Sequence, residues 1–191
     1  MPKCTSFKEL FKGCSSLKTV NLDNIHSEKP INCNSMFYNC SSLANETLDF
    51  TGIENFYDMS YMFSTARYVK KVKFKKGALN FTGKQYLNSE YNPLNSVFNE
   101  MNSVESIENL EDLEIPDVKS IRELFKATQK LKSINLPNLN LSTVENTSYT
   151  FYTAGAESIS IPNTEKINNI KTMENMFNSA SSLKQLDFPP L

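Results

Sequence analysis

Hydrophobic and polar residues alternate along the chain in a pattern that recurs about every 26 residues. Each repeat aligns on one phenylalanine, taken as position 0, with hydrophobic residues at positions −4 and −1 and a small or slim residue at +3. Because these positions fall on one face of an α-helix, the pattern predicts an amphipathic helix of about two turns in every repeat. The seven reference phenylalanines, separated by 26, 26, 35, 27, 26 and 26 residues, are Phe11, Phe37, Phe63, Phe98, Phe125, Phe151 and Phe177.

The residue at position −5 favours the same interpretation. In six of the seven repeats it is Ser, Thr, Asn or Asp, whose side-chain oxygen can accept a hydrogen bond from the free N–H groups at a helix N-terminus. Gly13 and Asn39, at position +2, suit the left-handed residue that ends many helices. A helix of two turns is unstable alone, so neighbouring repeats must bury its hydrophobic face.

A second hydrophobic pattern follows each predicted helix, at positions +6, +9 and +11. Its last alternation has a period of two residues, which predicts a short strand with one buried side. Repeat 4 reaches the pattern with six extra residues, at Leu110, Leu113 and Ile115, and repeat 6 reaches it one residue early. Proline directly follows several of these strands, as in Leu136-Pro137, and is expected to end them.

Two oppositely charged segments occupy equivalent positions of repeats 3 and 4 in this alignment. If consecutive strands stack in parallel about 4.8 Å apart, the basic segment VKKVKFKK faces the acidic segment LEDLEI. The alignment therefore predicts a ladder of salt bridges across strands rather than a basic patch for nucleic acid. The predicted pairs are Lys70 with Glu111, Lys71 with Asp112, and Lys73 with both Glu114 and Asp49.

Composition and charge narrow the possible functions further. A net charge of −1 argues against a general nucleic-acid binder, and no hydrophobic run approaches the roughly 18 residues of a membrane span. Cys14 and Cys40 occupy the small position +3 and are expected to be buried hydrophobic residues. The four cysteines form no C-x-x-C pair, and His26 is the single histidine, so we predict no metal site, no cofactor and no enzymatic activity.

One segment, residues 77–96, departs from the repeat and carries nine extra residues. Insertions in a solenoid often determine binding specificity. The alternative is a surface insertion that the fold tolerates and that has no role in binding. Apart from this insertion, residues 1–191 are expected to form a single solenoid domain. The repeat pattern runs nearly to both ends, and terminal repeats need polar caps, so we expect a segment of a longer chain, or flanking domains or partner chains that cap the ends.

The phrases LFKGCSSLKTVNL (residues 10–22) and MFNSASSLKQLDFP (residues 176–189) resemble the repeat of BspA-type leucine-rich-repeat surface proteins, with DUF285-like repeats. With the pattern above, the resemblance predicts an α/β leucine-rich-repeat solenoid of about seven 26-residue repeats. Each repeat would hold a short helix and a short strand, with the parallel sheet on the concave face. The resemblance also implies a microbial protein at the cell surface or secreted, used for adhesion. Similar modules in tail proteins of gut bacteriophages imply a virion location as the alternative.

These observations predict a non-enzymatic module that binds a protein or glycan ligand through the outward side chains of its sheet. Polar side chains on a rigid sheet need little ordering when they bind. Neither nucleic-acid binding nor membrane insertion is expected. The alternatives are a structural spacer, an attachment module of a larger assembly such as a bacteriophage tail, or an enzyme that uses a carboxylate pair. The predicted binding residues are Asp49, Lys71, Lys73, Asp112, Glu114 and Asn135 on the strands, and Tyr86 and Tyr91 in the insertion.

Overall fold

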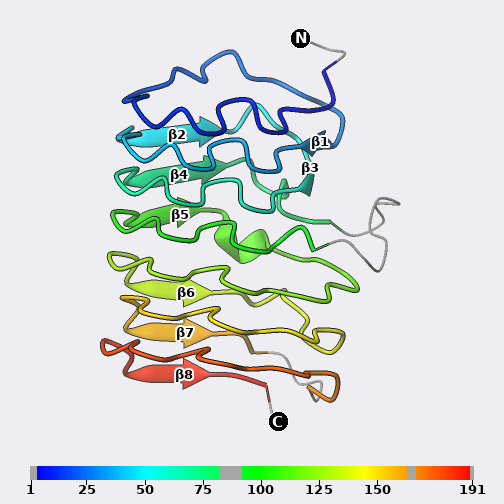
Figure 1. Ribbon diagram of the computed structural model, residues 1–191. Coiled ribbons are helices and arrows are strands. Elements are labelled where there is room, and N and C mark those ends of the chain that lie inside the picture. Colours follow the sequence, from blue (N-terminus) through cyan, green and yellow to red (C-terminus); the bar gives the residue numbers. More distant parts are fainter. Residues whose placement is uncertain (1–3, 82–91, 163–166, 190–191) are drawn as a thin grey trace.

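The repeats wind into a parallel β-solenoid of about six turns (Figure 1). The structure, a computed structural model, describes residues 4–81, 92–162 and 167–189. Each repeat passes once along a side of the stack that carries short strands and once along a side built from turns. The N- and C-terminal repeats therefore lie at opposite ends of the stack, and consecutive repeats are neighbours in space.

Short parallel strands form at the predicted positions in repeats 2, 3, 5, 6 and 7, and with a strand of repeat 4 they make two three-stranded sheets along the stack. A further pair of strands lies apart from these two sheets. The first sheet contains β2 (Thr47–Phe50), β4 (Lys71–Phe74) and β5 (Ser106–Glu108). The second contains β6 (Ser133–Asn135), β7 (Ser158–Ser160) and β8 (Gln185–Asp187). The separate pair is β1 (Ile31–Asn32) with β3 (Phe56–Asp58).

The predicted helices do not form, so the prediction of an α/β leucine-rich-repeat solenoid with a helix in each repeat was wrong. Among the described residues the only helical element is η1 (Leu110–Asp112), a single 3₁₀ turn. Where a helix was expected, every repeat enters the left-handed region of the backbone twice, at positions −2 and +2. Phe37, for example, is flanked by Ser35 at φ 54° and Asn39 at φ 60°. Left-handed residues four positions apart cannot belong to an α-helix of L-residues.

Two alternating sets of backbone hydrogen bonds hold the turn layer, which we define as positions −5 to +3 of all repeats. The N–H groups at even positions donate to the next repeat, as from Phe37 to the carbonyl of Met62 at 2.8 Å. Those at −1, +1 and +3 donate three residues back, as from Cys40 to the carbonyl of Phe37 at 3.0 Å. A two-turn helix would leave its first N–H groups unpaired and join the repeats through side chains alone. The turn layer instead links every repeat to the next through its backbone.

The polar residues at position −5 accept backbone N–H groups, but they do so in turns rather than at helix N-termini. The side-chain oxygen of Asp58 accepts the N–H of Ser60 at 3.0 Å, and that of Asn32 accepts the N–H of Asn34 at 2.8 Å. Short polar side chains suit both settings because each offers an acceptor next to a free N–H group. The hydrogen-bonding role predicted for these residues was therefore right, although the helical conformation was wrong.

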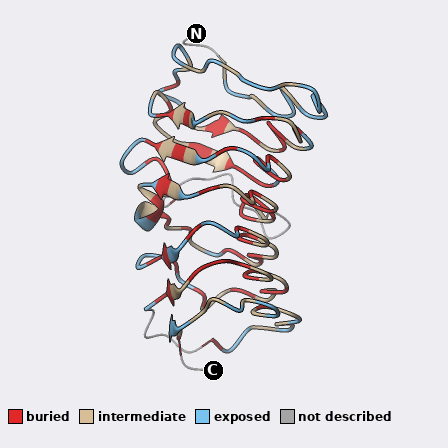
Figure 2. Cartoon of the chain, turned by 90° about the vertical axis from the view of Figure 1, so that its left-hand side faces the viewer, coloured by how far each residue is buried: buried red, intermediate tan, exposed pale blue. Residues whose placement is uncertain are grey.

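A column of phenylalanine rings fills the core behind the turn layer. The seven reference phenylalanines make six successive stacked pairs, with centroid distances of 5.3–6.1 Å and interplanar angles of 3–17°. The five inner rings are at most 2% exposed, whereas Phe11 and Phe177 at the two ends are only partly buried. Buried residues run through the middle of the stack, and the first repeat is largely exposed or half-buried (Figure 2). The repeat register read from the sequence is thus the register of the core.

The left-handed positions predict a stabilising substitution at Thr153, which has φ 51° and a β-branched side chain. A β-branched residue is strained there, whereas Asn tolerates this conformation and already occupies the equivalent position at Asn39. We expect Thr153→Asn to raise the free energy of unfolding by about 1 kcal/mol. Urea unfolding followed by circular dichroism measures the change. Thr19→Asn, at an exposed position without positive φ, is the control and should leave the midpoint unchanged.

Candidate binding surface

The strands of the two three-stranded sheets point alternate side chains outward, and we call this outward row the strand face. The inward side chains are hydrophobic, and those before the last repeat are buried, as Leu48, Val72 and Ile134 show at 0–1% exposure. The outward side chains are all polar, which is the alternation expected of strands with one buried side. The strand face consists of Thr47, Asp49, Lys71, Lys73, Ser106, Glu108, Ser133, Asn135, Ser158, Ser160, Gln185 and Asp187.

The first half of the strand face carries a row of alternating charge across three strands. Lys73 on β4 is in register with Asp49 on β2 and with Glu108 on β5. The ammonium group of Lys73 lies 3.3 Å from a carboxylate oxygen of Glu108, and both side chains are partly exposed, at 35% and 49%. An exposed ion pair contributes little stability, about 0–1 kcal/mol. These charged groups therefore remain available to a partner.

Asp49 is held in its ionised form by its neighbours. Its side-chain oxygen accepts hydrogen bonds from the hydroxyl of Thr51 at 2.6 Å and from the N–H of Thr51 at 2.9 Å. The Thr51 hydroxyl is the main cause that lowers the pKa of Asp49, and the charge of Lys73 adds a smaller effect. Because the folded pKa is depressed, this stabilisation is present above the ordinary pKa of Asp and is lost as the pH falls through the folded value. Asp49 therefore presents a fixed negative charge at neutral pH.

The salt-bridge ladder predicted between VKKVKFKK and LEDLEI was wrong. Of the predicted pairs, only Lys73 with Asp49 of repeat 2 is in register. Asp112 lies in η1 and accepts the N–H of Gly77 at 2.8 Å. Glu114 accepts the side-chain amide of Asn80 at 2.8 Å. Lys70 forms its ion pair with Glu46, at 2.9 Å, rather than with Glu111. The acidic residues therefore fasten the segment after β4 and do not belong to the strand face.

The error arose from the position assigned to the strand of repeat 4. Val104 and Ile107 stand at +6 and +9 without any insertion, and both are buried. Position +11 is Asn109, where the pattern requires a hydrophobic residue. The strand was therefore predicted six residues downstream, at Leu113 and Ile115. In the structure Asn109 adopts φ 62° and directly precedes η1, so the extra residues follow the strand instead of preceding it. Glu108, the partner of Lys73, was therefore missed, although Ile107 between two polar residues indicated a strand.

The second half of the strand face is nearly uncharged. β6, β7 and β8 present Ser133, Asn135, Ser158, Ser160 and Gln185, with Asp187 as the only ionised side chain. Asn135 is exposed, as predicted for a binding residue, but it lies in a different sheet from Lys71 and Lys73.

A pocket of about 190 Å³ separates the two halves of the strand face. Glu105, Ser106 and Glu111 line one side, and Ser133 and Asn135 line the other. The pocket lies where η1 follows β5, between two sheets that do not pair with each other. The strand face thus has a charged half, a polar pocket and a neutral half in succession along the stack.

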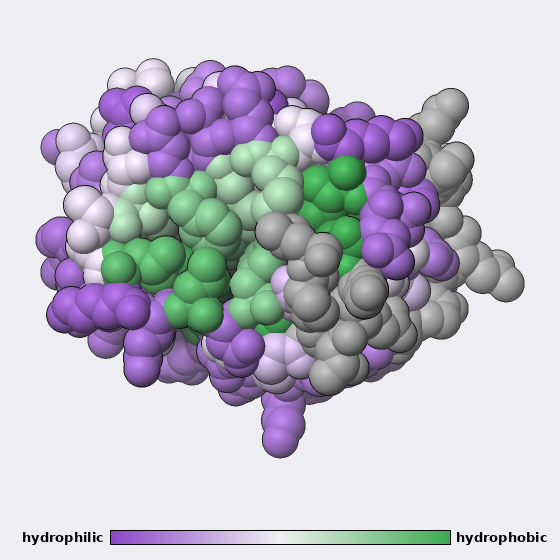
Figure 3. All heavy atoms as spheres, turned by 90° about the horizontal axis from the view of Figure 1, so that it is seen from below, coloured by the Kyte–Doolittle hydropathy of each residue, from purple (hydrophilic) through white to green (hydrophobic). Residues whose placement is uncertain are grey.

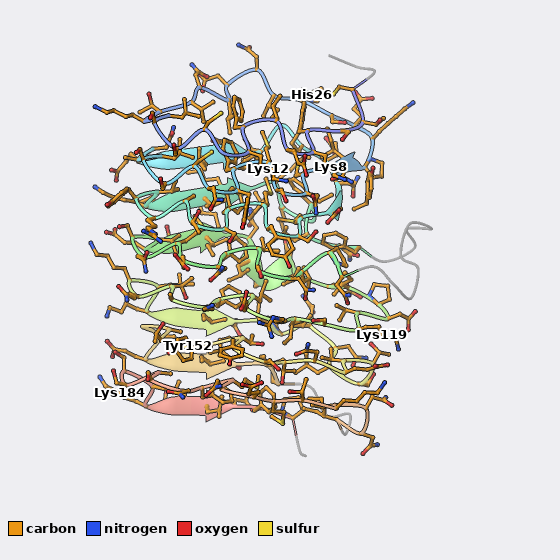
Figure 4. The ribbon with its side chains drawn as sticks, viewed as in Figure 1. Lys8, Lys12, His26, Lys119, Tyr152 and Lys184 are labelled. Atoms are coloured by element: carbon orange, nitrogen blue, oxygen red, sulfur yellow. The ribbon has the colours of Figure 1, made fainter. Side chains whose placement is uncertain are left out.

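Tyrosines occur both in the insertion and in the turn layer. Tyr86 and Tyr91 lie outside the described residues. In the turn layer, two pairs of tyrosine side chains lie next to each other. Tyr38 and Tyr61 have ring centroids 6.0 Å apart, and Tyr149 and Tyr152 have theirs 5.6 Å apart (Tyr152 is labelled in Figure 4).

The four cysteines differ in how deeply they are buried. Burial raises the pKa of the Cys33 thiol well above its ordinary value, and it is the main cause that raises the pKa of Cys40 to about 11. A thiol held in the protonated form is a poor nucleophile. Cys14 was expected to be buried but is exposed, because it lies in the first repeat. Within residues 4–81, 92–162 and 167–189, no group of three or more His, Cys, Asp and Glu side chains is placed to hold a metal ion.

Comparison with known proteins identifies the family. A family model described as "Mycoplasma protein of unknown function, DUF285" matches residues 2–76 and 74–187. The chain belongs to this family. The DUF285 match thus covers nearly all of the repeats and spans both halves of the strand face. No match was found among curated proteins or among solved structures. Within the part of the chain that the structure describes, no helix has the length and hydrophobicity that a membrane span requires.

Proposed function

We propose that this chain is a non-enzymatic binding module that attaches to a protein or glycan through its strand face. The observation that carries the proposal is the row of outward polar side chains on backbone-paired strands. Their positions are fixed by the parallel ladders, so binding costs little conformational entropy. The mixture of charged, hydroxyl and amide groups matches polar ligands better than lipid.

We propose that the charged half of the strand face makes the first contact with the protein or glycan ligand. Lys71, Lys73, Asp49 and Glu108 form a compact group of both signs on β2, β4 and β5. Such a group selects a partner by the pattern of its charges and not by net charge, which agrees with the net charge of −1 for the whole chain. The neighbouring pocket could accept a small polar group of the same ligand.

The setting of this activity follows from the resemblance of the repeats to BspA-type surface proteins. We propose display on a microbial cell surface, where the module would serve adhesion to a host protein or glycan. Display on a virion, as in bacteriophage tail proteins with similar repeats, is the alternative.

The test is a binding screen of the chain against arrayed host matrix proteins and glycans. The strand-face variant replaces Asp49, Lys71, Lys73 and Glu108 by Ser. The matched control replaces Arg67, Glu100, Glu145 and Lys171 by Ser, which removes two exposed ion pairs outside the strand face. Like the strand-face variant, it leaves the net charge of the chain unchanged. We expect saturable binding that the strand-face variant weakens at least tenfold and the control retains, with both circular dichroism spectra unchanged.

Three results would overturn the proposal. Full binding by the strand-face variant, or equal loss in both variants, would contradict a binding site on the strand face. Absence of binding to any arrayed ligand would instead favour a structural spacer, whose repeats only separate other parts of an assembly.

A further inference from the structure

Among the described residues, the first and the last repeat expose complementary halves of one backbone ladder. In the inner repeats, the N–H groups at −2, 0 and +2 each donate to a carbonyl of the next repeat. In the last repeat the corresponding groups are those of Asn175, Phe177 and Ser179, and none has an acceptor among the described residues. The matching acceptors of the first repeat are the carbonyl groups of Lys8, Leu10 and Lys12. Within the described part of the chain they likewise receive no backbone N–H.

Hydrophobic side chains that the inner repeats bury are exposed at these same ends. Leu10, at position −1, is 53% exposed, whereas Met36 and Leu124 at that position are 0% exposed. At the other end Leu186 is 47% exposed, whereas its register partner Ile159 on β7 is 1% exposed. Figure 3 shows the hydrophobic patch on the C-terminal end of the stack, bordered by hydrophilic residues.

The first repeat is also hollowed where a preceding repeat would pack. A pocket of about 320 Å³ opens there, and its lining includes Phe7, Leu10, Phe11, Leu22 and Ile25. His26, Lys8 and Lys12 are labelled on this part of the chain in Figure 4, and Lys184 is labelled in the last repeat. The hydrophobic walls of this pocket are the positions that a neighbouring repeat covers elsewhere in the stack.

We propose that the last repeat of one copy docks on the first repeat of a second copy, so that the chains stack head to tail. Three backbone hydrogen bonds, from Asn175, Phe177 and Ser179, would continue the ladder into the carbonyl groups of Lys8, Leu10 and Lys12. Phe177 would continue the column of rings onto Phe11. The interface is the same one that joins consecutive repeats within the chain, which is why a second copy fits it in register.

Charges at the proposed interface are balanced. Glu174 and Lys8 both occupy position −3, so stacking in register brings opposite charges together about 5 Å apart. Lys18 and Lys184 are the like-charged pair in register, but Lys184 is already paired with Glu157 at 2.8 Å. Hydrophobic burial and the backbone ladder therefore drive the association, and added salt should change it little.

A head-to-tail contact uses two different surfaces, so it does not close unless the stack bends into a ring. The expected product is an open series of dimers, trimers and longer stacks whose proportions depend on concentration. Each added copy would also add another strand face, which increases the avidity of the proposed binding activity.

Sedimentation velocity on the 191-residue chain tests the proposal with two single variants. Leu10→Lys damages only the first repeat and Leu186→Lys only the last, and both side chains are exposed, so the fold should tolerate the changes. We expect association of the unchanged chain to rise with concentration, and each variant alone to remain monomeric. An equimolar mixture should form dimers and nothing larger, because one intact end of each variant remains. Tyr68→Lys, at a 56% exposed position inside the stack, is the matched control and should associate normally.

The outcomes separate head-to-tail stacking from other contacts. A chain that stays monomeric at every concentration overturns the proposal, and so does self-association that neither leucine substitution reduces. Dimers of Leu10→Lys alone would instead indicate contact between two C-terminal ends. The two monomeric variants also allow ligand binding to be measured without stacking, so failure of the proposed function would be recognised separately.

Discussion

Replacing Phe125 by Ala is expected to lower the free energy of unfolding by about 3–5 kcal/mol. The ring is fully buried and stacks between Phe98 at 5.4 Å and Phe151 at 5.9 Å. Its removal leaves a cavity that the flanking rings cannot fill, because hydrogen bonds from the N–H groups of Phe98 and Phe151 to the next repeats fix their backbones. Urea unfolding followed by circular dichroism measures the loss.

The cost should depend on the place of the ring in the column. Phe177 stacks on Phe151 but is only partly buried in the last repeat, so Phe177→Ala should cost less than half as much. In a solenoid, stability is nearly a sum of repeats and of the contacts between neighbours, and loss of a central contact also weakens the coupling of the two halves. A broader or biphasic transition for Phe125→Ala is therefore expected. Equal losses at the two positions would contradict this account of the column.

The core residues were predicted well because the spacing of hydrophobic side chains can be the same in different backbone conformations. Hydrophobic residues at −4, −1, 0 and +3 are buried in the inner repeats, as the helical interpretation required. A chain of turns closed by hydrogen bonds three residues back produces nearly the same spacing as a helix of 3.6 residues per turn. The distinguishing signal was weak, because Glu9, Ser35 and Tyr61 give no hint of a left-handed backbone at −2. Bonds between repeats decide the conformation, and they are not local in the sequence.

The candidate binding surface was predicted in part for a similar reason. Asp49, Lys71 and Lys73 were placed correctly on neighbouring strands because repeats 2 and 3 follow the standard spacing. Asp112 and Glu114 were misplaced because an insertion can precede or follow a strand, and the period alone does not distinguish the two cases. A repeat pattern does not show whether another repeat covers the first one. The exposure of Cys14 could therefore not be predicted from it. In the first repeat, burial is determined by position in the stack more than by residue type.

A second large loss of stability is expected for Gly155→Ala. An added Cβ at this buried position would lie 1.7 Å from the carbonyl oxygen of Gln129 in the preceding repeat. The approach is close because repeat 6 reaches its strand one residue early: Ala156 takes the place that Leu131 has in repeat 5, so the chain takes a shorter path past Gln129. The atom in the way belongs to the backbone and cannot rotate aside. We expect a loss of about 3 kcal/mol or more, measured as a shift of the urea midpoint.

Gly13→Ala separates this steric effect from the conformational preference of glycine. Gly13 has φ 76°, but nothing lies within 4 Å of the position that its Cβ would take. Its replacement should therefore cost only the strain of a left-handed residue, about 1 kcal/mol. Gly52→Ala should behave like Gly155→Ala, since its Cβ would lie 2.0 Å from the carbonyl oxygen of Ile25. Equal losses of stability for all three substitutions would mean that close approach of consecutive repeats is not what requires glycine at positions 52 and 155. The short path of repeat 6 past Gln129 would then have to be relaxed in solution.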